Sequence, residues 1–152
     1  MSSDPKIDRK TAVVSTCLAG LAVALLMVGV VSGTILRHIV QIVPLLAAIH
    51  VVRRRPPFGA YAALPIFFFW TLIVTLIWMF LAGLSTIANG RYTAAEIVST
   101  IVMAACCVFG APHAIQMGRR VALSTRVATF LLFATFQVAA MWLSFTTFVA
   151  NR

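Results

Sequence analysis

The residues best suited to binding or proton chemistry are four polar side chains in otherwise apolar sequence: Arg37, His38, Gln41 and Glu96. Ionisable and amide groups are costly inside a bilayer, so each of them requires a partner or a function. Glu96 is the only carboxylate beyond the N-terminal tail. We therefore expect Glu96 either to neutralise Arg37 in an ion pair or to form with it a polar pocket for a ligand or ion. In a third interpretation, Arg37 simply extends into the lipid headgroups.

Helical spacing places these side chains on two faces. Arg37 and Gln41 share one face of the helix expected over residues 34–52, because residues four apart are neighbours on a helix. The helix expected over residues 94–117 has a comparable stripe, which consists of Glu96, Thr100, Met103, Cys107 and Gly110. If the two faces meet, Arg37 reaches Glu96 near one membrane surface. Thr93 and Glu96 also form the pattern of a capping box, which predicts the start of the second helix.

Two histidines lie at similar depth near the other ends of these helices. His50 precedes one group of arginines and His113 precedes another. Two imidazoles on different helices at one level can ligate a haem or another metal. No carboxylate is close enough in sequence to orient them, and residues near His50 include no glycine to admit a haem ring. Histidines at helix ends that contact lipid headgroups are the simpler interpretation, and we expect no cofactor.

Catalysis is not supported by the motifs of the chain. Hydrolytic or transfer chemistry usually requires a carboxylate pair, a nucleophile beside a base, or a metal cluster. One carboxylate within the apolar runs cannot supply the first, and the sequence has no motif of the other kinds. The three cysteines also lie in apolar runs, so we interpret them as packing residues. We expect a protein that is not an enzyme.

The elements that position these residues are membrane spans. The chain of 152 residues is 62% hydrophobic and only 10% charged, which is too apolar for a soluble domain. Its apolar runs exceed the roughly 18 residues that indicate a spanning helix. We expect an all-α, polytopic bundle that follows a polar cytoplasmic tail over residues 1–10. Residues 11–152 would then form one transmembrane bundle with spans at about 11–31, 34–52, 58–84, 94–117 and 127–149.

The basic residues predict how these spans are oriented. Nine of the twelve Lys and Arg residues fall in three clusters, which are Lys6/Arg9/Lys10, Arg53/Arg54/Arg55 and Arg119/Arg120/Arg126. Basic loops are retained on the cytoplasmic side during insertion. Five spans with a cytoplasmic N-terminus place these nine inside and leave Arg37, Arg91 and Arg152 outside. We expect the anionic headgroups of the membrane to contact Arg53, Arg54, Arg55, Arg119 and Arg120.

The second span is the uncertain one. Its cleanly apolar part, 39–52, provides only about 21 Å of helix, whereas residues 34–52 provide about 28 Å, close to the thickness of a hydrocarbon core. If this segment failed to cross, the twelve Lys and Arg residues would divide five to seven between the two sides of the membrane, which hardly favours either orientation. The sequence therefore predicts five spans, and the alternative is four spans plus a short re-entrant or interfacial helix at 37–52.

The function expected from these observations is general. The first hypothesis is a non-enzymatic structural or accessory membrane subunit that associates with itself or with a larger membrane complex. The stripe of small residues Thr16, Gly20 and Ala24 favours it, and Gly29 and Gly33 add a weak G-x-x-x-G pattern. The second is a small homo-oligomeric transporter or exporter that uses Arg37, Gln41 and Glu96. Electron transfer through a haem on His50 and His113 is a distant third.

The partners and the location follow from the same pattern. We expect membrane lipids as partners and no nucleic acid, because the arginines cap apolar segments and do not line one face of a helix. The absence of organellar or glycosylation signals favours a bacterial inner membrane. The N-terminus would be cytoplasmic and the C-terminus outside.

Overall fold

The computed structural model describes residues 8–86, 92–118 and 121–146, and these form five α-helices. The helices are α1 (Arg9–Val31), α2 (Ile35–Arg54), α3 (Pro56–Leu81), α4 (Ala94–Met117) and α5 (Leu123–Ser144). Each is long and apolar enough to cross a membrane. The predicted class, a five-helix transmembrane bundle, is confirmed.

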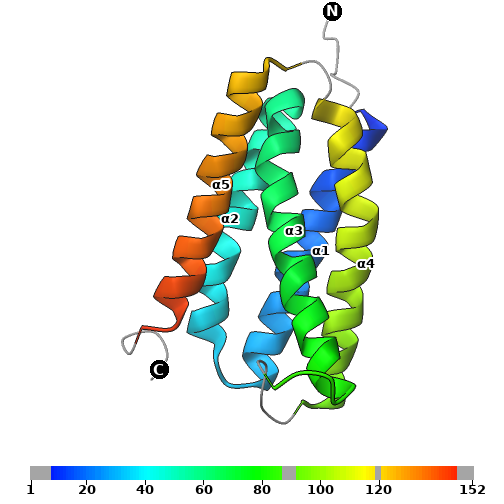
Figure 1. Cartoon of the computed structure of the whole chain (residues 1–152), viewed down its shortest axis with the longest axis vertical. Helices are drawn as coiled ribbons and strands as arrows, with labels where there is room; N and C mark the ends of the chain where they lie inside the picture. Colours follow the sequence, from blue (N-terminus) through cyan, green and yellow to red (C-terminus); the bar gives the residue numbers. More distant parts are fainter. Residues whose placement is uncertain (1–7, 87–91, 119–120, 147–152) are drawn as a thin grey trace, which may run out of the picture.

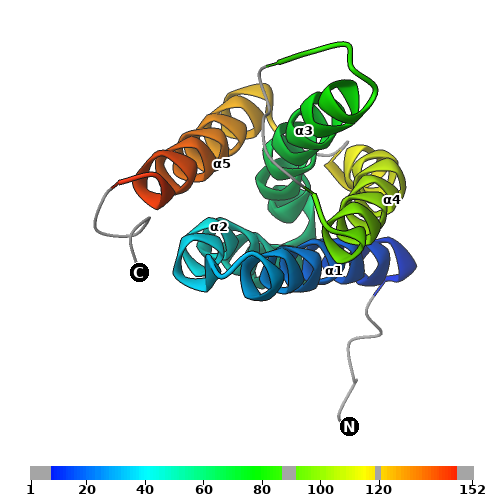
Figure 2. The ribbon, with the colours of Figure 1, turned by 90° about the horizontal axis from the view of Figure 1, so that it is seen from below.

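The helices pack antiparallel to their neighbours in the chain (Figure 1). In an end view, α1 and α2 form one row and α3 lies behind it with α4 and α5 (Figure 2). α3 packs against α2, α4 and α5, and α1 packs against α2 and α4. Therefore α2 and α4 each pack against both α1 and α3, and they form no packed interface with each other.

The bundle has two chemically different ends. The end where α1, α3 and α5 finish and α2 and α4 begin is called here the Arg37 end, at the bottom of Figure 1. At the opposite end α2 finishes at Arg53 and Arg54, and it is called here the Arg53 end. Two glycines with positive φ angles, Gly33 at 68° and Gly83 at 73°, follow α1 and α3 at the Arg37 end. Their left-handed backbone ends both helices there.

The uncertain second segment is a full helix. α2 has 20 residues, about 30 Å of helix, which matches the hydrocarbon core. Pro44 lies inside it and is buried. The structure thus favours five spans over the alternative with a short helix at 37–52.

Some predicted bounds differ from the observed ones. α3 ends at Leu81, three residues before the predicted end, because the chain turns at Gly83. α5 begins at Leu123, so Arg126 belongs to its first turn, where its guanidinium lies 5.7 Å from the centroid of the Tyr61 ring. Residues 1–7, Arg91, the pair Arg119 and Arg120, and the predicted end of the fifth span at 147–149 lie outside the described residues.

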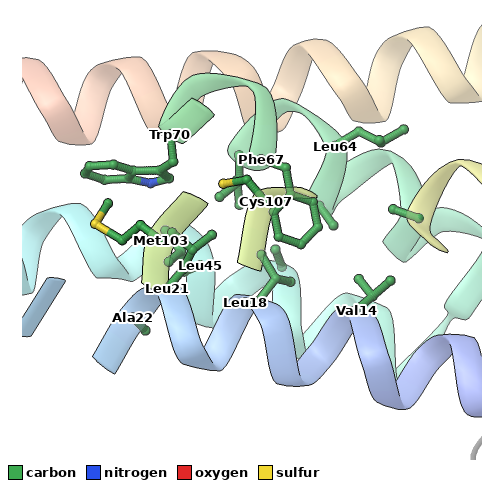
Figure 3. Packing of buried hydrophobic residues seen from close by; sticks show 14 of the residues in the cluster. Val14, Leu18, Leu21, Ala22, Leu45, Leu64, Phe67, Trp70, Met103 and Cys107 are labelled. Carbon is green, nitrogen blue, oxygen red and sulfur yellow. The ribbon is translucent and has the colours of Figure 1, made fainter. Parts of the chain in front are cut away.

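The interior toward the middle of the bundle is filled by large apolar side chains (Figure 3). Leu18, Leu21, Leu45 and Phe67 are fully buried there. Phe67 packs directly on α4, because a Cβ added to Gly110 would lie only 2.3 Å from its Cζ. This close approach requires glycine at position 110 and closes the space between α3 and α4.

Candidate functional site

A cavity of about 280 Å³ opens at the Arg37 end and is called here the Arg37 cavity. All five helices contribute to its walls. Its polar lining residues are Ser32, Thr34, Arg37, His38, Gln41, Trp70, Tyr92, Glu96 and Thr100. Its apolar lining residues are Leu25, Val28, Ile73, Ile77, Met103 and Met141. The four residues of the predicted polar cluster therefore line one cavity.

Arg37 is half-buried on the first turn of α2. Its guanidinium carbon lies 3.7 Å from the centroid of the Phe145 ring, which follows α5. Its Nε atom is buried, and within the described residues the guanidinium forms neither a hydrogen bond nor an ion pair. A cation over an aromatic face is stabilised by the ring quadrupole. The contact with Phe145 leaves the five N–H donors of Arg37 unused by that part of the chain.

Glu96 also lines the cavity, but it does not form the expected ion pair with Arg37. Its Oε2 accepts hydrogen bonds from Thr93 N at 2.7 Å and from Thr93 Oγ1 at 2.9 Å. The predicted capping box is thus present at the start of α4. The physical reason for the missing ion pair is that α2 and α4 pack on α1 and α3. Their polar faces line the cavity between them and do not meet.

Gln41 connects α2 to α5 in the wall of the cavity. It is 2% exposed, and its Nε2 donates to Ser144 Oγ at 2.9 Å and to Met141 Sδ at 3.2 Å. Ser144 Oγ in turn donates to Met141 O at 2.6 Å. The amide oxygen of Gln41 accepts no hydrogen bond within the described residues. It remains an acceptor for whatever enters the cavity.

The ring of His38 is oriented by its own helix. Its Nδ1 lies 3.0 Å from Thr34 O and 3.2 Å from Thr34 Oγ1. A carbonyl only accepts, so Nδ1 carries a proton, and in the neutral form of the ring Nε2 is an acceptor. Gly29 makes room for the ring, since a Cβ there would lie 3.0 Å from His38 Cβ.

Trp70 and Tyr92 line the cavity and were missed by sequence reasoning. Trp70 is 3% exposed, and its indole N–H donates no hydrogen bond within the described residues. Tyr92 precedes α4, and its ring centroid lies 6.0 Å from that of Phe80. Burial, and then the nearby Glu96 carboxylate, raise the pKa of Tyr92 above its usual value, so its phenol remains a donor. In the sequence, only the aromatic run 67–70 indicated that Trp70 faces a neighbouring helix, and no pattern indicated a role for Tyr92.

The cavity ends inside the bundle. Trp70 and Met103 line its deepest part, and Figure 3 shows them side by side at one end of the filled interior. One helical turn further in lie Leu21, Leu45, Phe67 and Cys107, which are at most 2% exposed. Met103 is nine residues into α4, so the cavity extends about 14 Å along the helices. These buried side chains fill the interior beyond the cavity.

The two predicted inner histidines are not brought together as a pair. His50 is exposed on α2, where it lines a surface depression with Arg53 and Arg54. His113 lies on α4, and its Nδ1 donates to Phe109 O at 2.8 Å. The described residues contain no group of three His, Cys, Asp or Glu side chains placed to hold a metal ion. Of the predicted lipid-contacting arginines, Arg53, Arg54 and Arg55 are exposed, and Arg119 and Arg120 lie outside the described residues.

Three small residues of α1, Gly20, Ala24 and Gly29, are used for packing within the chain. A Cβ on Gly20 would lie 2.8 Å from Cys106 Sγ on α4, and Ala24 is 4% exposed. Gly29 packs on His38, and Gly33 forms the turn after α1. Thr16, the third residue of the predicted stripe, is exposed. Comparison with known proteins adds no relative: no family model, curated protein or solved structure matches the chain.

Proposed function

We propose that this chain is a non-enzymatic membrane protein that binds a small polar ligand in the Arg37 cavity, as an accessory or receptor subunit. The observation that carries the proposal is the Arg37 guanidinium, which lines the cavity and has no hydrogen bond or ion pair within the described residues. A half-buried cation with unused donors is costly without a ligand or water beside it. A bound ligand would therefore offset the free-energy cost of burying the Arg37 cation.

Transport by the same site is the second candidate. The unused donors of Arg37 and the polar lining of the cavity favour it too, because substrate sites of transporters also lie in polar cavities between helices. A layer of buried side chains that includes Phe67 and Leu45, both 0% exposed, lies between the cavity and the Arg53 end. A binding role therefore needs no change of structure, whereas a transport role needs this layer to open.

The cavity would face the exterior. This orientation follows from the placement of Arg53, Arg54 and Arg55 at the other end of the bundle, because basic residues favour the cytoplasmic side. The membrane would be a bacterial inner membrane, with the N-terminus in the cytoplasm. Reporter fusions after residues 35 and 56 test this arrangement. Residue 35 should report outside and residue 56 inside, and the same side for both would contradict a second span.

Cysteine accessibility separates binding from transport. In a background with Cys17, Cys106 and Cys107 replaced by Ser, the variants Thr100→Cys and Ala114→Cys place a thiol at two depths of α4. Both native side chains are at most 3% exposed, but only Thr100 lines the cavity. A small membrane-impermeant methanethiosulfonate reagent, applied outside right-side-out vesicles, should modify Thr100→Cys and leave Ala114→Cys unmodified. Modification of both would favour a transport path, and modification of neither would contradict an open binding cavity.

A further inference from the structure

The Arg37 cavity offers two kinds of unused hydrogen-bonding group. The donors are the guanidinium of Arg37 and the phenol of Tyr92. Arg37 is a cation, so this set suits an anionic group. Guanidinium groups bind carboxylates and phosphates through two parallel hydrogen bonds.

The acceptors belong to Glu96, Gln41 and His38. Both hydrogen bonds that Glu96 receives from Thr93 end on Oε2, so Oε1 accepts none within the described residues. Gln41 uses its amide nitrogen and not its amide oxygen. In the neutral form of His38, Nε2 has a lone pair, because Nδ1 carries the one proton of the ring. Among the described residues, Glu96 is the one carboxylate in the cavity lining, and a carboxylate suits an ammonium group, which carries three donors and no acceptor.

The two charged groups are kept apart by the architecture of the bundle. Arg37 stands on α2 and Glu96 on α4, and the cavity lies between these helices. Without an ion pair between them, one charge of each sign remains available to a ligand. The volume of about 280 Å³ is at the lower end of small-molecule sites, which restricts the ligand to a few heavy atoms beyond its two charged groups.

We propose that the ligand of the Arg37 cavity is a small zwitterion, with a phosphate or carboxylate group bound at Arg37 and an ammonium group bound at Glu96. The inference rests on the proposed binding function and specifies its ligand. Two sources have this chemistry in a membrane environment. One is a free zwitterion from solution, and the other is the headgroup of a zwitterionic phospholipid such as phosphatidylethanolamine.

Three probes with matched shapes test the need for both charges. Phosphoethanolamine carries both, inorganic phosphate carries only the anion, and ethanolamine carries only the cation. Each is titrated against the purified full chain in non-ionic detergent while the thermal unfolding midpoint is followed, because a ligand that binds the folded state raises it. We expect phosphoethanolamine to bind at least about tenfold more tightly than either single-charge probe, since each lost charged contact is worth at least that factor.

Two variants assign the charges to residues. Glu96→Gln keeps an acceptor for the capping box and removes the carboxylate charge, and Arg37→Gln removes the cation. Each should weaken phosphoethanolamine binding by about tenfold or more. Arg37→Lys should restore part of the affinity, which a loss of folding would not allow. Arg53→Gln, at the opposite end, is the matched control and should bind as the native chain does.

Nanodiscs of two compositions distinguish the sources. If the headgroup is the ligand, the native chain unfolds at a higher temperature in phosphatidylethanolamine than in phosphatidylglycerol, and the difference disappears in Arg37→Gln and Glu96→Gln. Inorganic phosphate that binds as tightly as phosphoethanolamine, with no effect of Glu96→Gln, would overturn the zwitterion and leave the binding function intact. No response to any probe or lipid would also overturn the zwitterion. A different result would contradict the binding function itself: a thiol of Thr100→Cys that the impermeant reagent cannot modify from outside.

Discussion

The guanidinium carbon of Arg37 lies 3.7 Å from the centroid of the Phe145 ring, so the end of α5 covers a cation that stands on α2. Such a contact contributes about 0.5–1 kcal/mol where it is accessible to water and more where it is desolvated. It also keeps α5 in place at the mouth of the cavity, beside the hydrogen bond from Gln41 to Ser144.

Replacing Phe145 by Leu should therefore lower the free energy of unfolding by about 0.5–1 kcal/mol. The loss should disappear when Arg37 is already Gln, because no cation then faces the ring. A double-mutant cycle that follows thermal unfolding measures this coupling. Equal losses in both backgrounds would show that Phe145 contributes only apolar packing.

Gln137 is fully buried on α5, and neither atom of its amide has a hydrogen-bond partner within the described residues. An unpaired buried polar group costs about 1–3 kcal/mol. We expect Gln137→Leu to raise the free energy of unfolding by about that amount. The control is Gln41→Leu, which removes the bond to Ser144 and should destabilise the chain. A clear loss of stability in Gln137→Leu would mean that its amide binds something in the membrane.

The capping box was predictable because its two residues, Thr93 and Glu96, are three positions apart and act within one turn of helix. The same holds for the five spans, because the length and composition of an apolar run decide whether it can cross a bilayer. The buried stripe of α4, which includes Thr100 and Met103, also followed from helical spacing.

The partner of Arg37 was not predictable, because it depends on which helices are neighbours. The sequence placed Arg37 and Glu96 at one membrane surface, but the bundle separates their helices with α1 and α3. Phe145 lies 108 positions from Arg37 in the sequence, and its place follows from the packing of α5 on α2 and α3. The same dependence on packing explains why Trp70 and Tyr92 were missed.

Two glycines at helix contacts should respond differently to alanine. A Cβ on Gly59 would lie 2.3 Å from the Cα of Val52, which is backbone and cannot move aside. A Cβ on Gly20 would lie 2.8 Å from Cys106 Sγ, the end of a side chain. We expect Gly59→Ala to cost about 1–3 kcal/mol of unfolding free energy and Gly20→Ala to cost less. A larger loss for Gly20→Ala would contradict the packing of α2 on α3.

Cys106 on α4 packs on α1, because its Sγ lies 2.8 Å from a Cβ placed on Gly20, one helical turn from Cys17. Cys107, the neighbour of Cys106, is instead buried in the core of the bundle. A membrane-permeant oxidant should therefore join Cys17 to Cys106 within one chain and leave Cys107 reduced, as mass spectrometry of the digested protein would show. A disulfide that includes Cys107, or a link between two chains, would contradict this arrangement of the helices.

The most direct measurement of the central claim is ligand protection of a thiol inside the Arg37 cavity. The rate at which the impermeant methanethiosulfonate reagent modifies Thr100→Cys is compared with and without phosphoethanolamine, in the background that lacks the native cysteines. A bound zwitterion should slow the modification by about tenfold at a concentration ten times its dissociation constant. Arg37→Gln, which should bind at least about tenfold more weakly, should reduce this protection to about twofold or less at the same concentration. An unchanged rate at concentrations that shift the unfolding midpoint would show that the ligand binds elsewhere, and would contradict the account.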